Sequence, residues 1–221
     1  ISNGKFYESQ FEEATIELLR EAHWQYAFGD DIHRKYTDPL IEEDLRNFLA
    51  VQYKDKNLTT SEMDSIVANL RNTGGQNDYY ALRNTFLLYR DGYDFAYSDG
   101  RSNPFRLEYI DFEHPVHNIF RCVNQFVMEQ GRENRRPDIL LFINGIPVCI
   151  IELKNPTKQN ATIHDAHTQI CTRYMRDIPA LLKYCALAVI SDGAKNALGA
   201  TYTPFEFFYE WKKIENEDKA G

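Results

Sequence analysis

Hydrophobic residues recur at helical spacing through the first part of the chain. In residues 11–22 the apolar positions share one face, and Ser9 and Glu12 form the Ser-x-x-Glu pattern of a helix start. Three further helices are predicted, from Asp38-Pro39 to about Leu49, from Thr59 to the Gly74-Gly75 pair, and from about Tyr79 to Tyr89. Residues 1–95 are thus predicted to be mostly helical, up to a break at YSDGRSNP, residues 97–104.

The second part of the chain changes to apolar runs typical of strands. These runs are FRLEYIDF (105–112), NIFRCVNQFVMEQ (118–130), DILLFI (138–143), PVCIIELK (147–154) and LAVISDG (187–193), with a helix predicted from about Ile163 to Tyr174. Their hydrophobicity is continuous, which is typical of strands covered on both faces, here by helices. The sequence therefore predicts one α/β domain over residues 1–221, with its sheet and helix core at about 105–193.

The register at the Asn-Gly turn between two of these runs decides which charged residues share a face. Side chains alternate along a strand, so Glu152 and Lys154 lie on the same face. A strict two-residue loop would set Asp138 opposite Ile151 and leave Glu152 on the wrong face. A three-residue loop, or a bulge at Ile146-Pro147, places Asp138 across from Glu152. We expect this second register, because proline cannot donate a ladder hydrogen bond.

Two carboxylates and an ammonium at the mouth of a hydrophobic sheet indicate metal-assisted chemistry. Magnesium typically takes one or two carboxylates and fills its other positions with water and phosphate oxygens. Lys154 beside such a metal could orient or help deprotonate an attacking water. Taken alone, Glu-x-Lys also occurs on solvated strand ends, and Pro-Asp in ordinary turns. Joined by two apolar strands and an Asn-Gly turn, the residues predict a site for phosphodiester cleavage.

Composition narrows the partners of the chain. The 221 residues are 43% hydrophobic, enough to bury a core, and 25 Lys and Arg against 33 Asp and Glu give a net charge of -8. That charge provides no overall attraction to nucleic acid or to an anionic membrane. There is no apolar run of membrane-spanning length and no signal peptide, so we expect a cytoplasmic protein without a membrane partner. The four cysteines lack a C-x-x-C pair and are expected to be buried thiols rather than zinc or iron–sulfur ligands.

One block of the sequence carries a family resemblance. RPDILLFINGIPVCIIELKNP, with VNQFVME before it and RYMRDIPALLKY and AVISDG after it, resembles the amino-terminal nuclease domain of the restriction (motor) subunit of type I restriction-modification enzymes. The resemblance covers about residues 105–193, with a weaker match in FEEATIELL near the start. It implies a restriction-endonuclease-like PD-(D/E)xK fold, a mixed central sheet flanked by helices. It also implies that Asp138 and Glu152 hold the metal and that Lys154 is the catalytic lysine.

The family also tends to carry Q-x-x-x-Y in the helix after the E-x-K strand. Here the match is Gln169 and Tyr174, in QICTRY, which are one residue too far apart. On a regular helix five residues turn the side chains about 140° apart, so both reach the site only if the helix is distorted. We expect Gln169 near the site. Tyr174 has two equally supported interpretations, as a site residue or as a half-buried tyrosine of the helix. Arg173 shares the face of Gln169 instead.

Two further groups have alternative interpretations. An acidic residue on the first helix often completes the metal site of related nucleases, and Glu12 is the candidate. Alternatively, Glu12 closes a capping box with Ser9. The stretch GRENRR is predicted to be a basic loop, and its Arg132, Arg135 and Arg136 could bind a DNA phosphate next to the scissile bond or simply keep the loop solvated.

The resemblance implies a type I site-specific deoxyribonuclease domain that cleaves unmodified foreign double-stranded DNA with Mg²⁺, or with Mn²⁺ in its place. No G-x-x-x-x-G-K-[ST] loop occurs in the sequence, so ATP is expected to be used by a helicase-like motor downstream in a longer chain and not to be bound here. Methyltransferase and specificity subunits are the expected partners. The alternatives are a catalytically silent docking domain of the motor subunit and a stand-alone repair nuclease. The intact charged triad argues against the first, and the net charge against the second.

Overall fold

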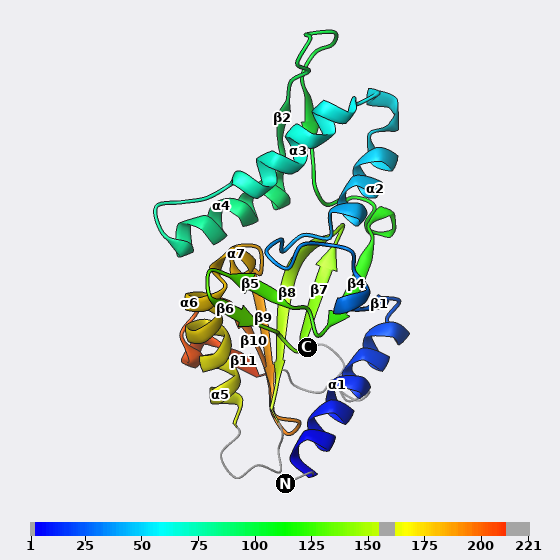
Figure 1. Ribbon diagram of the computed structural model, residues 1–221. Helices are drawn as coiled ribbons and strands as arrows, with labels where there is room; N and C mark the ends of the chain where they lie inside the picture. Colours follow the sequence, from blue (N-terminus) through cyan, green and yellow to red (C-terminus); the bar gives the residue numbers. More distant parts are fainter. Residues whose placement is uncertain (1–2, 155–161, 211–221) are drawn as a thin grey trace, which may run out of the picture.

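A seven-stranded mixed β-sheet forms the centre of the molecule (Figure 1). The computed structural model describes residues 3–154 and 162–210. In spatial order the strands are β1 (Gln25–Phe28), β4 (Phe120–Asn124), β7 (Ile139–Ile143), β8 (Ile146–Leu153), β9 (Leu187–Ser191), β10 (Asn196–Ala200) and β11 (Tyr209–Glu210). β1 runs parallel to β4 and β8 parallel to β9, whereas the other neighbours are antiparallel. The mixed α/β architecture expected from the sequence is confirmed.

Helices cover both faces of this sheet (Figure 1). One face packs against α1 (Asn3–Glu21), and the other against α5 (Ile163–Thr168), a π-helical turn η4 (Gln169–Tyr174), α6 (Met175–Asp177) and α7 (Pro179–Leu182). Neighbouring residues of β8 divide between the two layers. Ile151 shares an apolar cluster with Ile16 of α1, whereas Ile150 shares one with Ile170 of η4. This division explains the continuous hydrophobicity of the strand, since both of its faces are covered.

A helical lobe stands on one end of the sheet, at the top of Figure 1. It contains α2 (Glu42–Gln52), α3 (Thr60–Asn72), α4 (Asp78–Asp91) and the hairpin of β2 (Tyr93–Phe95) and β3 (Phe105–Leu107). The capping box at the start of α3, predicted from Thr59, is present. The start predicted for α2 is wrong, because Asp38 holds a loop instead. Its carboxylate accepts a hydrogen bond from the Leu40 N–H and forms an ion pair with Arg71.

The polar stretch 97–104 lies within the hairpin connection between β2 and β3, where Phe95 pairs with Phe105. The strands before and after this stretch therefore belong to the same lobe. In addition, α1 and β1, which come from the first part of the chain, belong to the central sheet layer. The predicted break is a solvated hairpin loop. Polar turn residues occur both in hairpin loops and in linkers between regions, so the sequence pattern alone does not distinguish them.

Short elements complete the described chain. They are the hairpin β5 (Met128–Gln130) and β6 (Glu133–Arg135) and the 3-10 turns η1 (Gly29–Asp31), η2 (Lys54–Lys56), η3 (Pro115–His117) and η5 (Phe205–Phe207). The GRENRR stretch is therefore a hairpin and not a loop throughout. Gly131 occupies its tip with a φ of 63°, a conformation that glycine adopts at no steric cost.

The turn between β7 and β8 is tighter than expected. It is a two-residue loop in which Asn144 and Gly145 have φ angles of 50° and 75°, and no bulge lies at Ile146-Pro147. The helical lobe fixes this turn, because the Ile41 N–H donates to the Gly145 carbonyl at 2.9 Å. A Cβ on Gly145 would lie 2.1 Å from the Ile41 carbonyl oxygen. The wide or bulged turn expected at residues 144–147 is therefore wrong.

A β-bulge one residue farther along gives the register that was expected. Val148 is the extra residue, since the pairing passes from Pro147 directly to Cys149. Beyond the bulge Ile139 pairs with Ile151. Asp138, the next residue outward, consequently lies across from Glu152.

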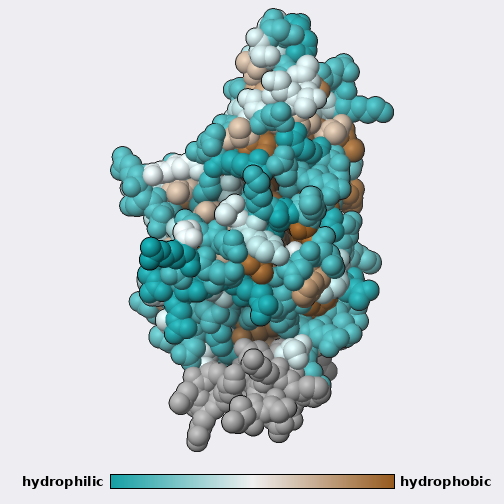
Figure 2. Space-filling view, in the orientation of Figure 1, coloured by the Kyte–Doolittle hydropathy of each residue, from teal (hydrophilic) through white to brown (hydrophobic). Residues whose placement is uncertain are grey.

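The surface seen in Figure 2 is mainly hydrophilic, with small separate hydrophobic patches. Within residues 3–154 and 162–210, no helix is long and apolar enough to cross a membrane. The four cysteines are free thiols. Cys122, Cys149 and Cys185 are buried, as expected, whereas Cys171 is half-buried and its thiol donates to the Thr201 carbonyl at 2.9 Å.

Candidate functional site

Asp138 and Glu152 meet at the end of the sheet away from the helical lobe, where β7 begins and β8 ends. The Asp138 carboxylate accepts a hydrogen bond from the Leu153 N–H through Oδ2, at 2.7 Å. Alternation along β8 puts Glu152 on the face of Ile150, which packs toward η4. Both carboxylates therefore point toward the helices that follow the strand.

The Glu152 carboxylate is buried and hydrogen-bonded on both oxygens. Its side chain is 1% exposed, and Oε1 accepts a hydrogen bond from Lys154 Nζ at 2.8 Å. Oε2 accepts one from the Tyr174 hydroxyl at 3.3 Å. Lys154 Nζ also donates to Gln169 Oε1, at 2.7 Å. The ammonium thus links the strand to the helix.

The helix carries Gln169 and Tyr174 to the same place because it is distorted. Residues 169–174 form the π-helical turn η4, and the Met175 N–H donates to the Ile170 carbonyl, five residues back. The wider turn brings the two side chains together, and Gln169 Nε2 donates to the Tyr174 hydroxyl at 2.7 Å. Single π-turns of this kind are frequent at functional sites. Tyr174 is buried, and it contacts Glu152 in spite of the extra residue in the motif.

The electrostatics of the cluster favour a cation. Burial, and then the negative charge of Asp138, raise the pKa of Glu152 to about 8, against the opposing effect of Lys154. Burial and the neighbouring Glu152 also raise the pKa of Tyr174, so its hydroxyl keeps its proton. Two carboxylates whose ionisation is mutually unfavourable form a donor set of hard oxygens. This set fits a divalent cation such as magnesium, whose charge would compensate both.

Glu12 lies in the interior of α1, which begins at Asn3, so the predicted capping box with Ser9 is wrong. The four residues directly before Ser9, KFYE, include neither glycine nor proline, so the helix continues through Ser9. Glu12 Oε1 accepts hydrogen bonds from Asn124 Nδ2 at 2.7 Å and from Gln125 Nε2 at 2.9 Å. Among the residues that the structure describes, Glu12 does not join Asp138 and another acidic group in a set whose ligand atoms all lie within 4.8 Å.

Asn124 and Gln125 connect Glu12 to the carboxylate pair, and the sequence pattern did not single them out. Asn124 pairs with Ile139 in the antiparallel ladder, which puts Gln125 across from Asp138. The Gln125 N–H donates to the Asp138 carbonyl at 3.3 Å. The only sequence signal for these two residues was a pair of amide side chains at the end of an apolar strand. Their position next to Asp138 followed only from the order of the strands in the sheet.

The three arginines of the GRENRR hairpin differ in their surroundings. Arg135 donates through Nε to Asp177 at 2.8 Å and also pairs with Glu133, so it is occupied within the protein. Arg136 is exposed and borders a surface pocket of about 320 Å³, which Arg173, Gln169 and Tyr174 also line. Arg132 is exposed at the hairpin tip and does not line that pocket.

The comparisons with known proteins identify the family of the chain. Residues 5–207 match the family described as "Type I restriction enzyme R protein N terminus". The chain therefore belongs to the family of amino-terminal regions of type I restriction enzyme R proteins.

Its relatives carry the same family assignment in their names. The type I restriction enzyme HindI endonuclease subunit of Haemophilus influenzae is 31% identical over 97% of this chain and 21% of its own length. The EcoprrI endonuclease subunit of Escherichia coli is 32% identical over 56% of this chain and 40% of its own length. The SsaAORF53P endonuclease subunit of Staphylococcus saprophyticus is 26% identical over 79% of this chain and 18% of its own length. The chain thus spans about a fifth of the HindI subunit.

Proposed function

We propose that the chain is the magnesium-dependent endonuclease domain of a type I restriction enzyme, with a PD-(D/E)xK fold that hydrolyses phosphodiester bonds of double-stranded DNA. The observation that carries the proposal is the contact between Glu152, Lys154 and the π-helical turn, with Asp138 across the strand pair. A docking domain would not require a buried carboxylate whose pKa is raised. Membership of the restriction-enzyme family supports the same reaction.

Asp138 and Glu152 would hold the magnesium ion, or manganese in its place. When bound, the ion supplies positive charge that stabilises the charge developing on the phosphodiester. Through its Nζ ammonium, Lys154 orients the attacking water and stabilises the hydroxide that the water becomes on losing a proton to solvent. Gln169 fixes Lys154 by hydrogen bonding, and Tyr174 fixes the far oxygen of Glu152. Glu12 contributes through Gln125 or as a further ligand when DNA is bound.

Delivery of the DNA would fall to other parts of the enzyme. A net charge of -8 gives this domain little long-range attraction for DNA. We infer that a helicase-like motor in the same polypeptide consumes ATP and moves the DNA, and that methyltransferase and specificity subunits recognise unmodified foreign sites. Such an enzyme would work in the cytoplasm.

Local contacts with the DNA backbone would come from the pocket beside η4. The guanidinium groups of Arg136 and Arg173 make no hydrogen bond or ion pair within the described part of the chain, and both residues are exposed. Their guanidinium groups are therefore available to bind the phosphate next to the scissile bond. Arg135, which is held by Asp177, instead anchors the hairpin.

The test is plasmid cleavage by the complete enzyme complex with ATP and magnesium. Asp138→Ala and Glu152→Ala in the full-length subunit should abolish cleavage and leave ATP hydrolysis at the wild-type rate. Glu129→Ala, which removes an exposed carboxylate on β5, is the matched control. Normal cleavage by both site variants would assign the domain a docking role. Loss of ATP hydrolysis in a folded variant would indicate that the site couples the motor to the nuclease instead.

A further inference from the structure

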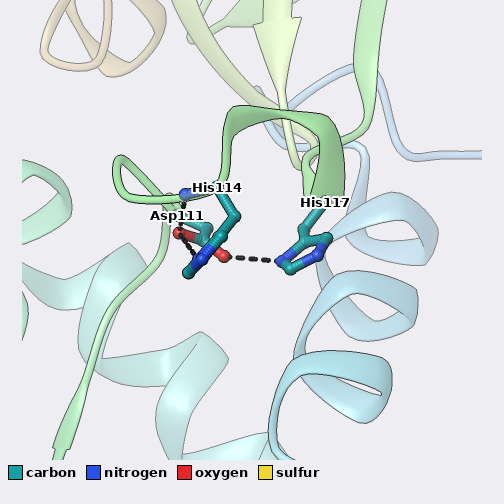
Figure 3. Close-up of side chains that lie close together, drawn as sticks. All are labelled: Asp111, His114 and His117. Atoms are coloured by element: carbon teal, nitrogen blue, oxygen red, sulfur yellow. Dashed lines mark hydrogen bonds and ion pairs between the residues drawn. The ribbon is translucent and has the colours of Figure 1, made fainter.

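A second cluster of chemically active side chains lies far from the carboxylate pair in the fold, in the segment between β3 and β4. Its residues are spaced D-x-x-H-x-x-H, as Asp111, His114 and His117. Pro115 begins the short 3-10 turn η3, which carries His117. Figure 3 shows that both imidazole rings approach the Asp111 carboxylate from the same segment.

The distances in this cluster suit a small metal ion. The ligand atoms of the three residues all lie within 4.8 Å of one another. His114 Nδ1 lies 3.8 Å from Asp111 Oδ1, and His117 Nδ1 lies 2.9 Å from Asp111 Oδ2. Two ligands of a tetrahedral zinc ion, each bound at about 2.0–2.1 Å, are separated by about 3.4 Å, so the two observed distances bracket the required one. Small rotations of exposed rings would complete the geometry.

The fold holds the carboxylate in place while the rings remain accessible. Asp111 is 5% exposed, whereas the side chains of His114 and His117 are 64% and 52% exposed. Asp111 Oδ1 accepts a hydrogen bond from the His114 N–H at 2.8 Å, and Oδ2 accepts one from Gln52 Nε2 at 3.2 Å.

We propose that Asp111, His114 and His117 form a binding site for a divalent transition-metal ion, with zinc as the typical occupant and water in the remaining position. Two imidazole nitrogens and one carboxylate oxygen suit zinc, cobalt and nickel, whereas magnesium takes oxygen ligands. The site is thus distinct in chemistry and position from the carboxylate pair of the proposed nuclease. Gln52, which hydrogen-bonds Asp111 Oδ2, acts as the outer partner that fixes this ligand.

The position of the site gives the metal a mechanical role. Gln52 belongs to α2 of the helical lobe, and Asn118 ties the other side of the segment to the sheet through Asn144. Asn118 Nδ2 donates to the Asp111 carbonyl at 2.8 Å. An ion held by Asp111 and both rings would therefore close the segment that joins the lobe to the sheet. Binding should stabilise the folded chain by an amount that grows with the logarithm of the free metal concentration above the Kd.

A matched control exists within the same chain. His164 and His167 have the same i, i+3 spacing, with ring centroids 6.3 Å apart. His167 Nε2 contacts the Thr203 carbonyl at 2.9 Å, and the pair shares no buried carboxylate among the described residues. This pair tests whether two neighbouring histidines alone account for any binding.

The experiment is a Co²⁺ titration of the metal-free 221-residue chain in excess Mg²⁺, followed by visible absorption, with Zn²⁺ as competitor. Wild type should bind Co²⁺ with a ligand-field band that Zn²⁺ removes. His114→Ala and His117→Ala should each weaken binding at least about 10- to 100-fold, and His164→Ala/His167→Ala should not. Zn²⁺ should raise the melting temperature of wild type and not that of His114→Ala/His117→Ala.

Two results would overturn the site. The first is equal Co²⁺ affinity of wild type and His114→Ala/His117→Ala. The second is the absence of a ligand-field band in wild type at micromolar Co²⁺. Both histidines are exposed, so equal melting temperatures of the metal-free proteins verify that the double variant is folded.

Discussion

The two ends of β8 differ in whether their buried polar groups stabilise the fold. At the Asn144 end the buried side-chain amide of Asn144 has partners for both its oxygen and its nitrogen. Asn144 is fully buried, accepts a hydrogen bond from the Ile119 N–H at 2.7 Å, and donates to the Tyr109 carbonyl at 2.9 Å. At the other end Glu152 is equally buried, but its ionisation is opposed by burial and by Asp138. One strand thus has an end that contributes stability and an end at which two acidic groups lie close together.

This difference shows how the fold supports chemistry. A buried amide with complete hydrogen bonding fixes the turn and hence the register of β7 against β8. That register, corrected by the bulge at Val148, is what brings Asp138 across from Glu152. The unfavourable carboxylate pair is therefore maintained by stability built at the far end of the same strand. Substitutions at the two ends should accordingly have opposite consequences for stability and activity.

Among substitutions that keep both carboxylates, Lys154→Ala should have the largest effect. The carboxylates and their metal affinity should remain, while the attacking water loses its orienting partner, so the cleavage rate should fall about 10²- to 10⁴-fold. Stability should fall as well, because Lys154 pairs with the buried Glu152 and hydrogen-bonds Gln169, so cleavage is compared per folded molecule. Plasmid cleavage by the complete complex, beside a thermal melt of the chain, measures both, and the exposed Lys195→Ala is the control. If Lys154→Ala cleaved DNA at the wild-type rate, the lysine would be a structural counter-charge and not a catalytic residue.

Asn144→Ala should affect the other end in the opposite sense. It leaves the Ile119 N–H and the Tyr109 carbonyl without partners in the interior, at a cost of about 3–5 kcal/mol in the free energy of unfolding. Cleavage per folded molecule should stay near wild type below the melting transition. Urea denaturation measures the loss, with the exposed Asn103→Ala as control. A loss below 1 kcal/mol would contradict the role given to this turn.

Glu152→Gln should stabilise the metal-free chain. The folded-state pKa of about 8 lies above the ordinary 4.5, so Glu152 keeps its proton in the fold while the unfolded chain ionises. Stability is then lost as the pH rises from about 4.5 to about 8. The glutamine variant lacks this loss and should exceed wild type by about 4 kcal/mol at pH 8, with little difference at pH 4.5. Urea denaturation in EDTA across that range tests the sign, and a pH-independent difference would refute the buried, raised pKa.

The smallest effect is expected at the pocket beside η4. Arg136→Ala/Arg173→Ala should weaken DNA binding roughly tenfold, equivalent to about 1.4 kcal/mol, and lower the slope of log affinity against log salt by about 1 for each arginine. The exposed Arg83→Ala in the helical lobe should leave the slope unchanged. An unaltered slope in the double variant would mean that the pocket does not bind phosphate.

Much of the central layer could be predicted from the sequence. The apolar runs of β7, β8 and β9 and the helix between β8 and β9 were evident, because strands covered on both faces leave an unbroken hydrophobic signal. β1 was not predicted, since it has only four residues and is partly exposed. Similarly, β10 contains Gly199 and carries little hydrophobic signal.

The site depended on two local irregularities that no periodicity reveals. The bulge at Val148 and the π-helical turn at 169–174 each insert one residue, and each brings chemically related side chains together. From the sequence we could infer that Gln169 and Tyr174 meet only if the helix is distorted. Whether the helix is distorted could not be inferred. The surroundings of Glu12 also required the strand order, since its partners lie more than a hundred residues away.

The central claim is that Asp138 and Glu152 together hold a divalent metal ion, and Mn²⁺ binding tests it most directly. The measurement is a calorimetric titration of the 221-residue chain carrying His114→Ala and His117→Ala, with and without a short DNA duplex. Mn²⁺ should bind, with Mg²⁺ competing, and Asp138→Asn/Glu152→Gln in the same background should remove the binding. Mn²⁺ affinity unchanged by the two substitutions, in both the presence and the absence of DNA, would contradict the account.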